Sequence, residues 1–93
     1  MGRRSLPEGE ALLIDPCYSV HTMFMRFAID VVYLDSNDRV LKVVGRLRPF
    51  RASVCRGAKR VLEMPAGSAA LAGIKPADQL LYTEAGKSSS AGA

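Results

Sequence analysis

The stretch Ile29-Asp30-Val31-Val32-Tyr33-Leu34 decides the fold of this chain. Apart from Asp30, it consists of β-branched, aromatic and aliphatic residues, which favour a buried strand. The turn residues 35–38 follow it, and an extended apolar pattern resumes over 39–44 until Gly45. This order predicts a β-hairpin with strands at 29–34 and 39–44.

Shorter extended segments surround the hairpin. Further strands are predicted at 11–14, 20–26, 59–64 and 79–83, after a polar arm at 1–9 and with a loop at 46–58 that holds at most one short strand. Ser68 as N-cap and Gly73 as C-cap predict one short helix near residues 68–73. These elements predict a mainly β fold bordering on α+β, a small β-barrel or sandwich-like domain.

The composition is that of a single globular domain. The chain has 93 residues, of which 48% are hydrophobic and 24% charged. We expect the domain to span 1–85 and the small polar tail 86–93 to be disordered. No apolar run is long enough to span a membrane and no signal peptide is evident, so we expect a cytoplasmic protein with no membrane partner. Cys17 and Cys55 are expected to be reduced thiols.

Several short motifs follow one another along the chain. They are Pro16-Cys17, Val20-His21-Thr22, Phe24-Met25-Arg26-Phe27, Ile29-Asp30-Val31-Val32, Leu47-Arg48-Pro49, Val61-Leu62-Glu63, Pro65-Ala66-Gly67 and the turn from Gly73 to Asp78. Together these motifs resemble those of a prokaryotic family, domain of unknown function 192. The resemblance covers roughly residues 6–82, and a motif series of this length and order is specific. It implies a compact β-barrel-like domain and brings no established activity.

The chain also departs from the pattern of the family that it resembles. Relatives usually carry Pro at the position of Ala28, an aromatic residue at Met23, Trp at Phe50 and Gly at Ala77. They also commonly have a further strand region before a Gly-Leu-Met-Gly-Arg motif, within which this chain begins at Met1-Gly2-Arg3. A missing strand would leave a sheet edge unpaired, which predicts a homodimer joined through that edge.

Polar and sulfur-bearing side chains are concentrated between residues 17 and 30. A carboxylate that faces a core needs a partner, and for Asp30 we expect Arg26 or His21. We therefore predict a polar pocket that binds a small polar or anionic ligand without catalysis, and to which Glu63 and Asp78 would add carboxylates. The five residues expected to form the ligand site are Cys17, His21, Thr22, Arg26 and Asp30.

An enzyme is the main alternative. Cys17 would act as a nucleophile with His21 as its base, or Asp30 would carry the chemistry, in a hydrolase or transferase type of reaction. On an extended strand, however, Cys17 and His21 lie about 13 Å apart, so the loop between them would have to fold back. We favour a structural interpretation in which Cys17 is a small buried hydrophobe and His21 a hydrogen-bonded loop residue.

Metal binding is a weaker alternative. His21, Met23 and Met25 alternate along the chain and, together with Cys17, would offer soft ligands suited to Cu(I). Successive residues on one strand face are about 6.6 Å apart, so they would share an ion only if the strand bent. Methionines that fill the core are the commoner explanation, and we expect no metal and no cofactor.

A nucleic-acid-binding module is the third alternative. The segment 46–60 contains six cations and no acid, and Phe50 is available to stack on a base. A single aromatic is few for such a module, and no glycine-rich phosphate loop is present. We therefore rank nucleic acid below a small ligand as the partner. The six cations are Arg46, Arg48, Arg51, Arg56, Lys59 and Arg60.

Overall fold

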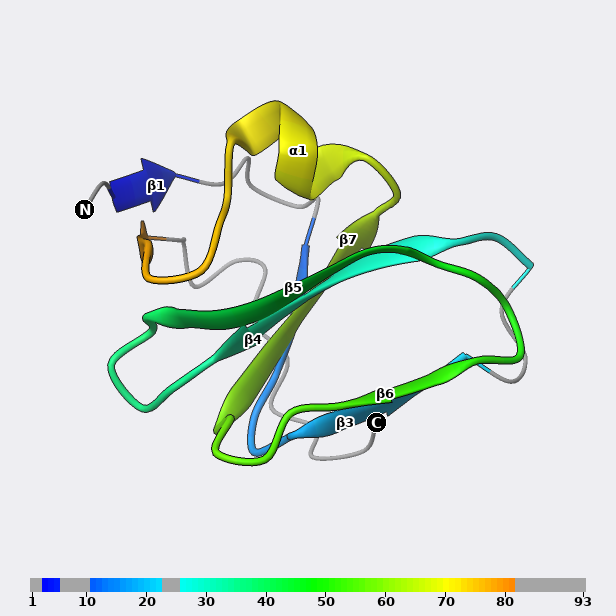
Figure 1. The fold of residues 1–93 in the computed structure, drawn as a ribbon, viewed down its shortest axis with the longest axis horizontal. Helices are drawn as coiled ribbons and strands as arrows, with labels where there is room; N and C mark the ends of the chain where they lie inside the picture. Colours follow the sequence, from blue (N-terminus) through cyan, green and yellow to red (C-terminus); the bar gives the residue numbers. More distant parts are fainter. Residues whose placement is uncertain (1–2, 6–10, 23–25, 82–93) are drawn as a thin grey trace.

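The computed structural model describes residues 3–5, 11–22 and 26–81, and it is mainly β with one short helix, as predicted (Figure 1). Its strands are β1 (Arg3–Ser5), β2 (Leu12–Ile14), β3 (Ser19–His21), β4 (Ile29–Leu34), β5 (Val40–Leu47), β6 (Ala52–Val54), β7 (Arg60–Pro65) and β8 (Gln79–Leu81), and the helix is α1 (Ser68–Ala72).

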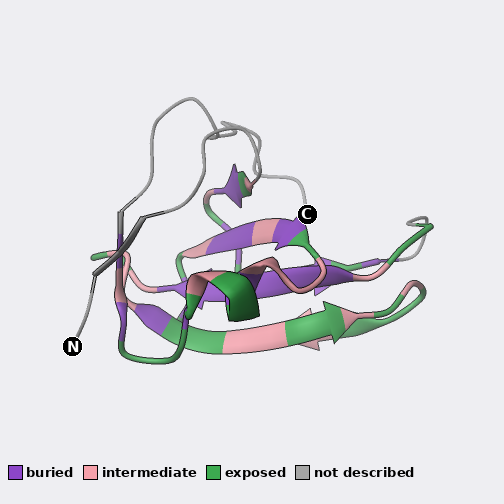
Figure 2. Cartoon of the chain, turned by 90° about the horizontal axis from the view of Figure 1, so that it is seen from above, coloured by how far each residue is buried: buried purple, intermediate pink, exposed green. Residues whose placement is uncertain are grey.

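The central sheet has four antiparallel strands in the order β2-β7-β4-β5. Strand β4 lies inside this sheet and is buried at all six positions, as its apolar sequence predicts. Figure 2 shows the same contrast within the sheet: the inner strands are coloured as buried over most of their length, whereas β5 is mostly half-buried or exposed.

Two hydrophobic clusters cover the two faces of the sheet. Successive residues of β4 and β7 alternate between them, because side chains on a strand point to opposite faces. Helix α1 and β8 complete the first cluster and the β3–β6 ribbon completes the second, above and below the sheet in Figure 1. The first cluster includes Leu13, Val32, Leu34, Leu62, Met64, Ala69 and Leu80; the second includes Ile14, Cys17, Val20, Val31, Tyr33, Ala58 and Val61.

The described strands form three separate sheets, so the prediction of a β-barrel is wrong and the sandwich-like alternative describes the layers better. Among the described strands, β3 and β6 pair only with each other, and β1 pairs only with β8. The edge strands of the central sheet are β2 and β5, and among the described residues these two do not pair with each other. Closure of a barrel needs a strand at each edge that pairs with the other edge.

The N-terminal arm was predicted to be irregular, but Arg3–Ser5 forms β1, which pairs in parallel with β8. Its polar sequence hides this role, since a three-residue strand carries almost no periodic signal. The predicted strand at 20–26 is shorter, because β3 ends at His21. Residues 23–25 and the predicted tail 86–93 lie outside the described residues.

The predicted hairpin of β4 and β5 is confirmed, although β5 continues to Leu47. The Asp35 carboxylate accepts hydrogen bonds from the backbone N–H groups of Asn37 and Arg39, at 2.8 and 3.0 Å. Asp38 then adopts a φ of 62°, which Asp tolerates better than most residues. The turn chemistry read from the sequence therefore operates as expected.

Arg60 connects this turn to the loop after β2. Its Nε lies 2.8 Å from Asp15 Oδ2, and its Nη1 lies 2.8 Å from Asp38 Oδ1. The hydrogen bond to Asp15 is the largest cause of the raised pKa of Arg60. One of the six cations in the basic segment is thus a structural residue.

Helix α1 has the predicted C-cap but a different N-cap. Gly73 has a φ of 71°, the left-handed conformation that ends helices. Gly67, with a φ of 91°, occupies the N-cap position, and no side chain of the cap bonds to the helix. Ser68 is the first helical residue, so its prediction as N-cap is wrong by one position.

None of the helices among the described residues is long and apolar enough to cross a membrane. Cys17 is buried and Cys55 half-buried, and both are free thiols.

Candidate functional site

Asp30 is a buried carboxylate placed between the sheet and α1. It lies on β4, on the same face as Val32 and Leu34, and only 1% of it is exposed. Its Oδ1 accepts a hydrogen bond from the backbone N–H of Arg46 at 2.9 Å, and its Oδ2 accepts one from Ala69 at 2.8 Å. The predicted partners Arg26 and His21 are not its partners here, since two backbone donors satisfy the carboxylate.

A β-bulge brings the first of these donors to Asp30. Ile29 pairs with Leu47 and Val31 with Val44, so two residues of β5, Gly45 and Arg46, stand opposite Asp30. Arg46 has a φ of 53°, in the left-handed region. Bulges of this kind redirect backbone groups and side chains and are frequent next to binding sites.

The second donor belongs to the first turn of α1. The backbone N–H groups of the first turn of a helix have no partner within the helix and need an external acceptor. Gly67 offers no side chain, so the carboxylate of Asp30 supplies that acceptor from the neighbouring strand. Asp30 therefore has a structural role that fixes both α1 and the bulge.

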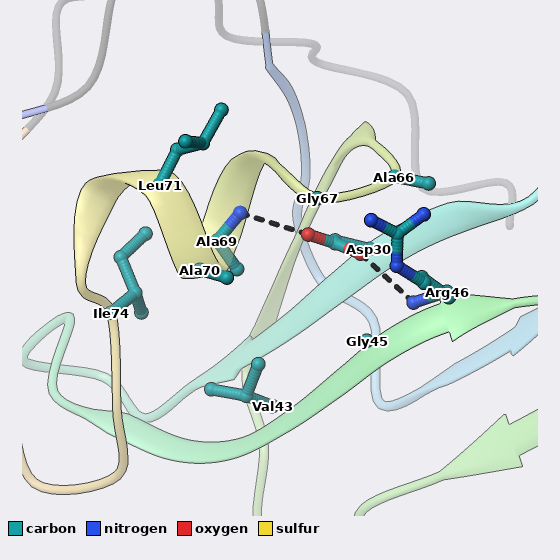
Figure 3. A pocket seen from close by; sticks show the side chains of 10 residues that line it. All are labelled: Asp30, Val43, Gly45, Arg46, Ala66, Gly67, Ala69, Ala70, Leu71 and Ile74. Atoms are coloured by element: carbon teal, nitrogen blue, oxygen red, sulfur yellow. Dashed lines mark hydrogen bonds between the residues drawn. The ribbon is translucent and has the colours of Figure 1, made fainter.

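A pocket of about 580 Å³ opens between α1 and the bulged part of β5, with Asp30 at its base (Figure 3). Its walls are mostly apolar, and 92% of Leu71 is exposed at the outer rim. The residues that line the pocket are Asp30, Val43, Gly45, Arg46, Ala66, Gly67, Ala69, Ala70, Leu71 and Ile74.

The guanidinium of Arg46 stands beside Asp30 in this pocket, near the loop of Ala66 and Gly67 (Figure 3). A Cβ atom at Gly67 would lie 3.3 Å from Nη2 of Arg46, so the glycine gives the guanidinium its space. Within the described part of the chain, no hydrogen bond or ion pair is made by this guanidinium. The pocket therefore combines an accessible five-donor cation with an apolar wall.

Thr22, one of the predicted ligand residues, is fully buried and belongs to a different part of the molecule. Its Oγ1 lies 2.7 Å from the carbonyl oxygen of Arg48 and 3.0 Å from that of Arg51, and it accepts a hydrogen bond from the backbone N–H of Arg51 at 2.9 Å. These bonds satisfy the hydroxyl and hold the loop between β5 and β6.

The remaining predicted residues are not gathered around Asp30. Cys17 packs in the second cluster, on the opposite face of the sheet, and its thiol donates to the carbonyl of Ser19 at 2.9 Å. Burial raises the pKa of the Cys17 thiol, which is unfavourable for a nucleophile. His21 and Arg26 are exposed. Of the five predicted residues, Asp30 alone lines the pocket under α1.

Two further ionisable groups lie on the Cys17 side of the sheet. Tyr33 is completely buried, and burial raises its pKa although Ser53 lies near enough to lower it in part. Ser53 is not a hydrogen-bond partner of acceptable geometry, and the Tyr33 hydroxyl has none among the described residues. Glu63 is half-buried, and its pKa is raised by burial.

Among the residues that the structure covers, no three His, Cys, Asp or Glu side chains are close enough to hold a metal ion.

Arg46 and Ala69 are the site residues that were not predicted as ligands of Asp30. Both act through backbone N–H groups, which every residue except proline carries, so the residue type gives no signal. The available signals were Gly45, which is one of the two bulge residues, and Gly67, which precedes the helix. Asp78, expected to join the pocket, instead accepts a hydrogen bond from the backbone of Lys75, and Glu63 points to the opposite face.

Comparisons with known proteins identify similar chains. Residues 1–82 match the family of domain of unknown function 192, described as an uncharacterized ACR, COG1430. The chain is 41% identical over 63 residues to UPF0127 protein PF1050 of Pyrococcus furiosus. The aligned region covers 67% of this chain and 53% of that protein.

A similar fold is found in the crystal structure of a protein of unknown function from Novosphingobium aromaticivorans. The TM-score is 0.66 at 23% identity, over 77% of this chain and 56% of the other. The chain thus spans about half the length of the curated relative and of the solved structure that it matches.

Proposed function

Since the chain belongs to the family of domain of unknown function 192, to which no activity is attached, we propose from its own geometry that it binds a small anionic ligand non-catalytically in the pocket under α1. The observation that carries this proposal is the guanidinium of Arg46, which shares the pocket with an apolar wall. A small molecule with a carboxylate at one end and an apolar body fits this combination.

The planar guanidinium suits a carboxylate because two parallel N–H donors match its two oxygens. Asp30 lies close to Arg46, so the site as a whole is nearly neutral. Recognition would therefore depend on paired hydrogen bonds more than on net charge. The backbone donors already bound to Asp30 leave Arg46 available to the ligand.

The apolar side of the pocket supports a ligand with a hydrocarbon portion. Val43, Leu71 and Ile74 line it, and Leu71 is almost fully exposed. A ligand that covers an exposed leucine removes apolar area from water, and this makes binding more favourable by about 25 cal/mol per Å². Longer apolar chains should therefore bind more tightly.

The composition of the pocket also supports binding without catalysis. The described residues that line it include no Ser, Cys, His, Lys or Tyr, so among them Asp30 has no nucleophile or second proton carrier beside it. Both carboxylate oxygens accept backbone hydrogen bonds that hold α1 and the bulge. An acid–base group that moved during turnover would break these contacts.

The test is an amide chemical-shift titration of the labelled protein with acetate, hexanoate and hexanol. We expect hexanoate to bind more tightly than acetate and to shift the amides of Gly45, Arg46, Gly67 and Ala69. The variant Arg46→Gln should weaken hexanoate binding by at least about tenfold, since hydrogen bonds to charged groups contribute about 1.5–3 kcal/mol. Leu71→Ala should weaken hexanoate but not acetate.

The matched control is Arg56→Gln, which removes an exposed arginine outside the pocket and should leave hexanoate binding unchanged. Equal binding of hexanol and hexanoate, or full binding by Arg46→Gln, would contradict the anionic ligand. Shifts confined to other parts of the sheet would contradict this pocket.

A further inference from the structure

Two loops meet at one end of the β4–β5 hairpin, on the right of Figure 1. Their described residues include exposed arginines and phenylalanines. Ile29 pairs with Leu47, which brings the residues just before β4 beside those just after β5. We call the exposed residues of these loops the basic end. They are Arg26, Phe27, Arg48, Phe50 and Arg51, and 66% of Phe27 and 64% of Phe50 are exposed.

The loop between β5 and β6 is held firmly from below by Thr22. The backbone N–H of Thr22 donates to the carbonyl of Arg51 at 2.9 Å, and the N–H of Phe50 donates to the carbonyl of Thr22 at 2.8 Å. The buried hydroxyl of Thr22 adds its contacts to the backbone of Arg48 and Arg51. The backbone that carries Phe50 is therefore fixed, while its ring stays exposed.

The conformation of Phe50 is unusual for an exposed aromatic residue. Its φ is 60°, a left-handed conformation that bulky residues rarely adopt. An exposed ring gains little from packing, so the fold of the loop alone would be served better by glycine or asparagine. Strained residues that the surrounding structure holds in place occur most often at functional sites.

The charge around Phe50 has a single sign. No acidic residue occurs between Asp15 and Asp30 or between Asp38 and Glu63, so both loops of the basic end are free of acids. Asp30 is buried and bonded to backbone groups. Asp35 and Asp38 lie at the turn, on the opposite end of the hairpin. The molecule therefore presents a positive end to an anionic partner.

We propose that the basic end binds single-stranded nucleic acid, with a base stacked on Phe50 and phosphates on Arg48 and Arg51. A base has an aromatic face that stacks on phenylalanine, and its neighbouring phosphates pair with flanking arginines. Of the described phenylalanines, both exposed ones have arginine as a sequence neighbour, Arg26 beside Phe27 and Arg51 beside Phe50. This interleaving suits a strand of alternating phosphates and bases better than a lipid surface, which favours a continuous apolar patch.

This surface differs from the pocket under α1 and does not depend on the ligand proposed there. Arg46 is left out of it, because its guanidinium lines that pocket. Arg60 is left out because it pairs with Asp15 and Asp38. Arg56 is exposed beyond the other end of β6, next to the turn at Gly57.

The experiment is fluorescence anisotropy with a labelled single-stranded oligonucleotide of about 12 nucleotides, repeated between about 50 and 200 mM salt. With Arg26 engaged beside Arg48 and Arg51, log K should fall against log salt with a slope of roughly −2. Phe50→Gly should weaken binding by at least about fivefold, because it removes the stacking ring. It should not unfold the loop, since glycine adopts a φ of 60° without strain.

The double variant Arg48→Gln/Arg51→Gln should reduce the slope to roughly −0.7, while the control Arg56→Gln should keep both the slope and the affinity. A slope near zero, undiminished binding by Phe50→Gly, or an equal effect of Arg56→Gln would overturn the proposal. So would binding of the wild type to phosphatidylserine vesicles but not to the oligonucleotide, which would assign the basic end to a lipid surface instead.

Discussion

At the scale of single residues, Glu63 links the buried second cluster to pH. It lies on β7 between Leu12 and Val31 of the neighbouring strands, and burial raises its pKa above the ordinary value of 4.5. A carboxyl whose pKa is higher in the folded state binds protons more readily there than in the unfolded chain. The protein should therefore lose stability as the pH rises from about 4.5 through the pKa of the folded state.

The variant Glu63→Gln tests this. Glutamine cannot ionise, so the variant should be more stable than the wild type at neutral pH, and the difference should vanish below pH 4.5. Urea unfolding of both proteins across this pH range measures the difference. A gap that stays constant with pH would show that hydrogen bonding or shape, and not ionisation, separates the two proteins.

Asp30 shows what a sequence predicts about a single buried residue. Its place among apolar residues of a strand predicted burial, and its alternation with Val32 and Leu34 predicted the correct face. The predicted partner of Asp30, a charged side chain, was wrong. A sequence identifies charged side chains, but it does not indicate which backbone N–H groups, here those of Arg46 and Ala69, will face a carboxylate. A bulge of one residue in β5 and a short helix arriving from residue 68 decide those contacts.

At the scale of elements, Asp30 joins three of them, because its two hydrogen bonds connect β4 with β5 and with α1. Asp30→Ala should lower the free energy of unfolding by about 3 kcal/mol, since the buried N–H of Ala69 and the partly buried N–H of Arg46 both lose a charged acceptor. Hydrogen exchange at the amide of Ala69 should speed up more than exchange in β7. Asp35→Ala is the matched control, because that carboxylate also accepts two backbone N–H groups but lies at a partly exposed turn.

We expect the control to cost about 1 kcal/mol or less, because water can replace the carboxylate at the turn. Equal losses in the two variants would mean that burial of Asp30 adds nothing to its role.

The elements themselves were predictable in proportion to their length and pattern. β4 was predicted at its observed bounds, and β7 and α1 within one residue at each end. β1 was missed, because its pairing with β8 joins the two ends of the described chain and leaves no local signal. The basic segment showed no period, and yet its loop is ordered by Thr22, a contact across 26 to 29 residues of sequence.

At the scale of the whole molecule, a homodimer through a sheet edge stays a hypothesis, and the central sheet shows where such an edge is available. No described strand pairs with the outer side of β5. That strand is interrupted by two register shifts and carries Lys42 and Arg46, features that natural edge strands use to discourage pairing. β1 offers a second outer edge, but it is only three residues long.

The two clusters should unfold together, because β4 and β7 contribute to both. Val61 and Leu62 are neighbours on β7 and point into the second and first cluster respectively. Leu62→Ala should cost roughly 2–5 kcal/mol and Val61→Ala roughly 1–3 kcal/mol, as lost burial and a cavity predict. In each variant, amide signals from α1 and from the β3–β6 ribbon should disappear at the same urea concentration, since a sheet strand cannot lose one face alone. If Val61→Ala releases the ribbon while α1 keeps its signals, the ribbon is a separate unit that docks on the sheet, and the basic end would move with it.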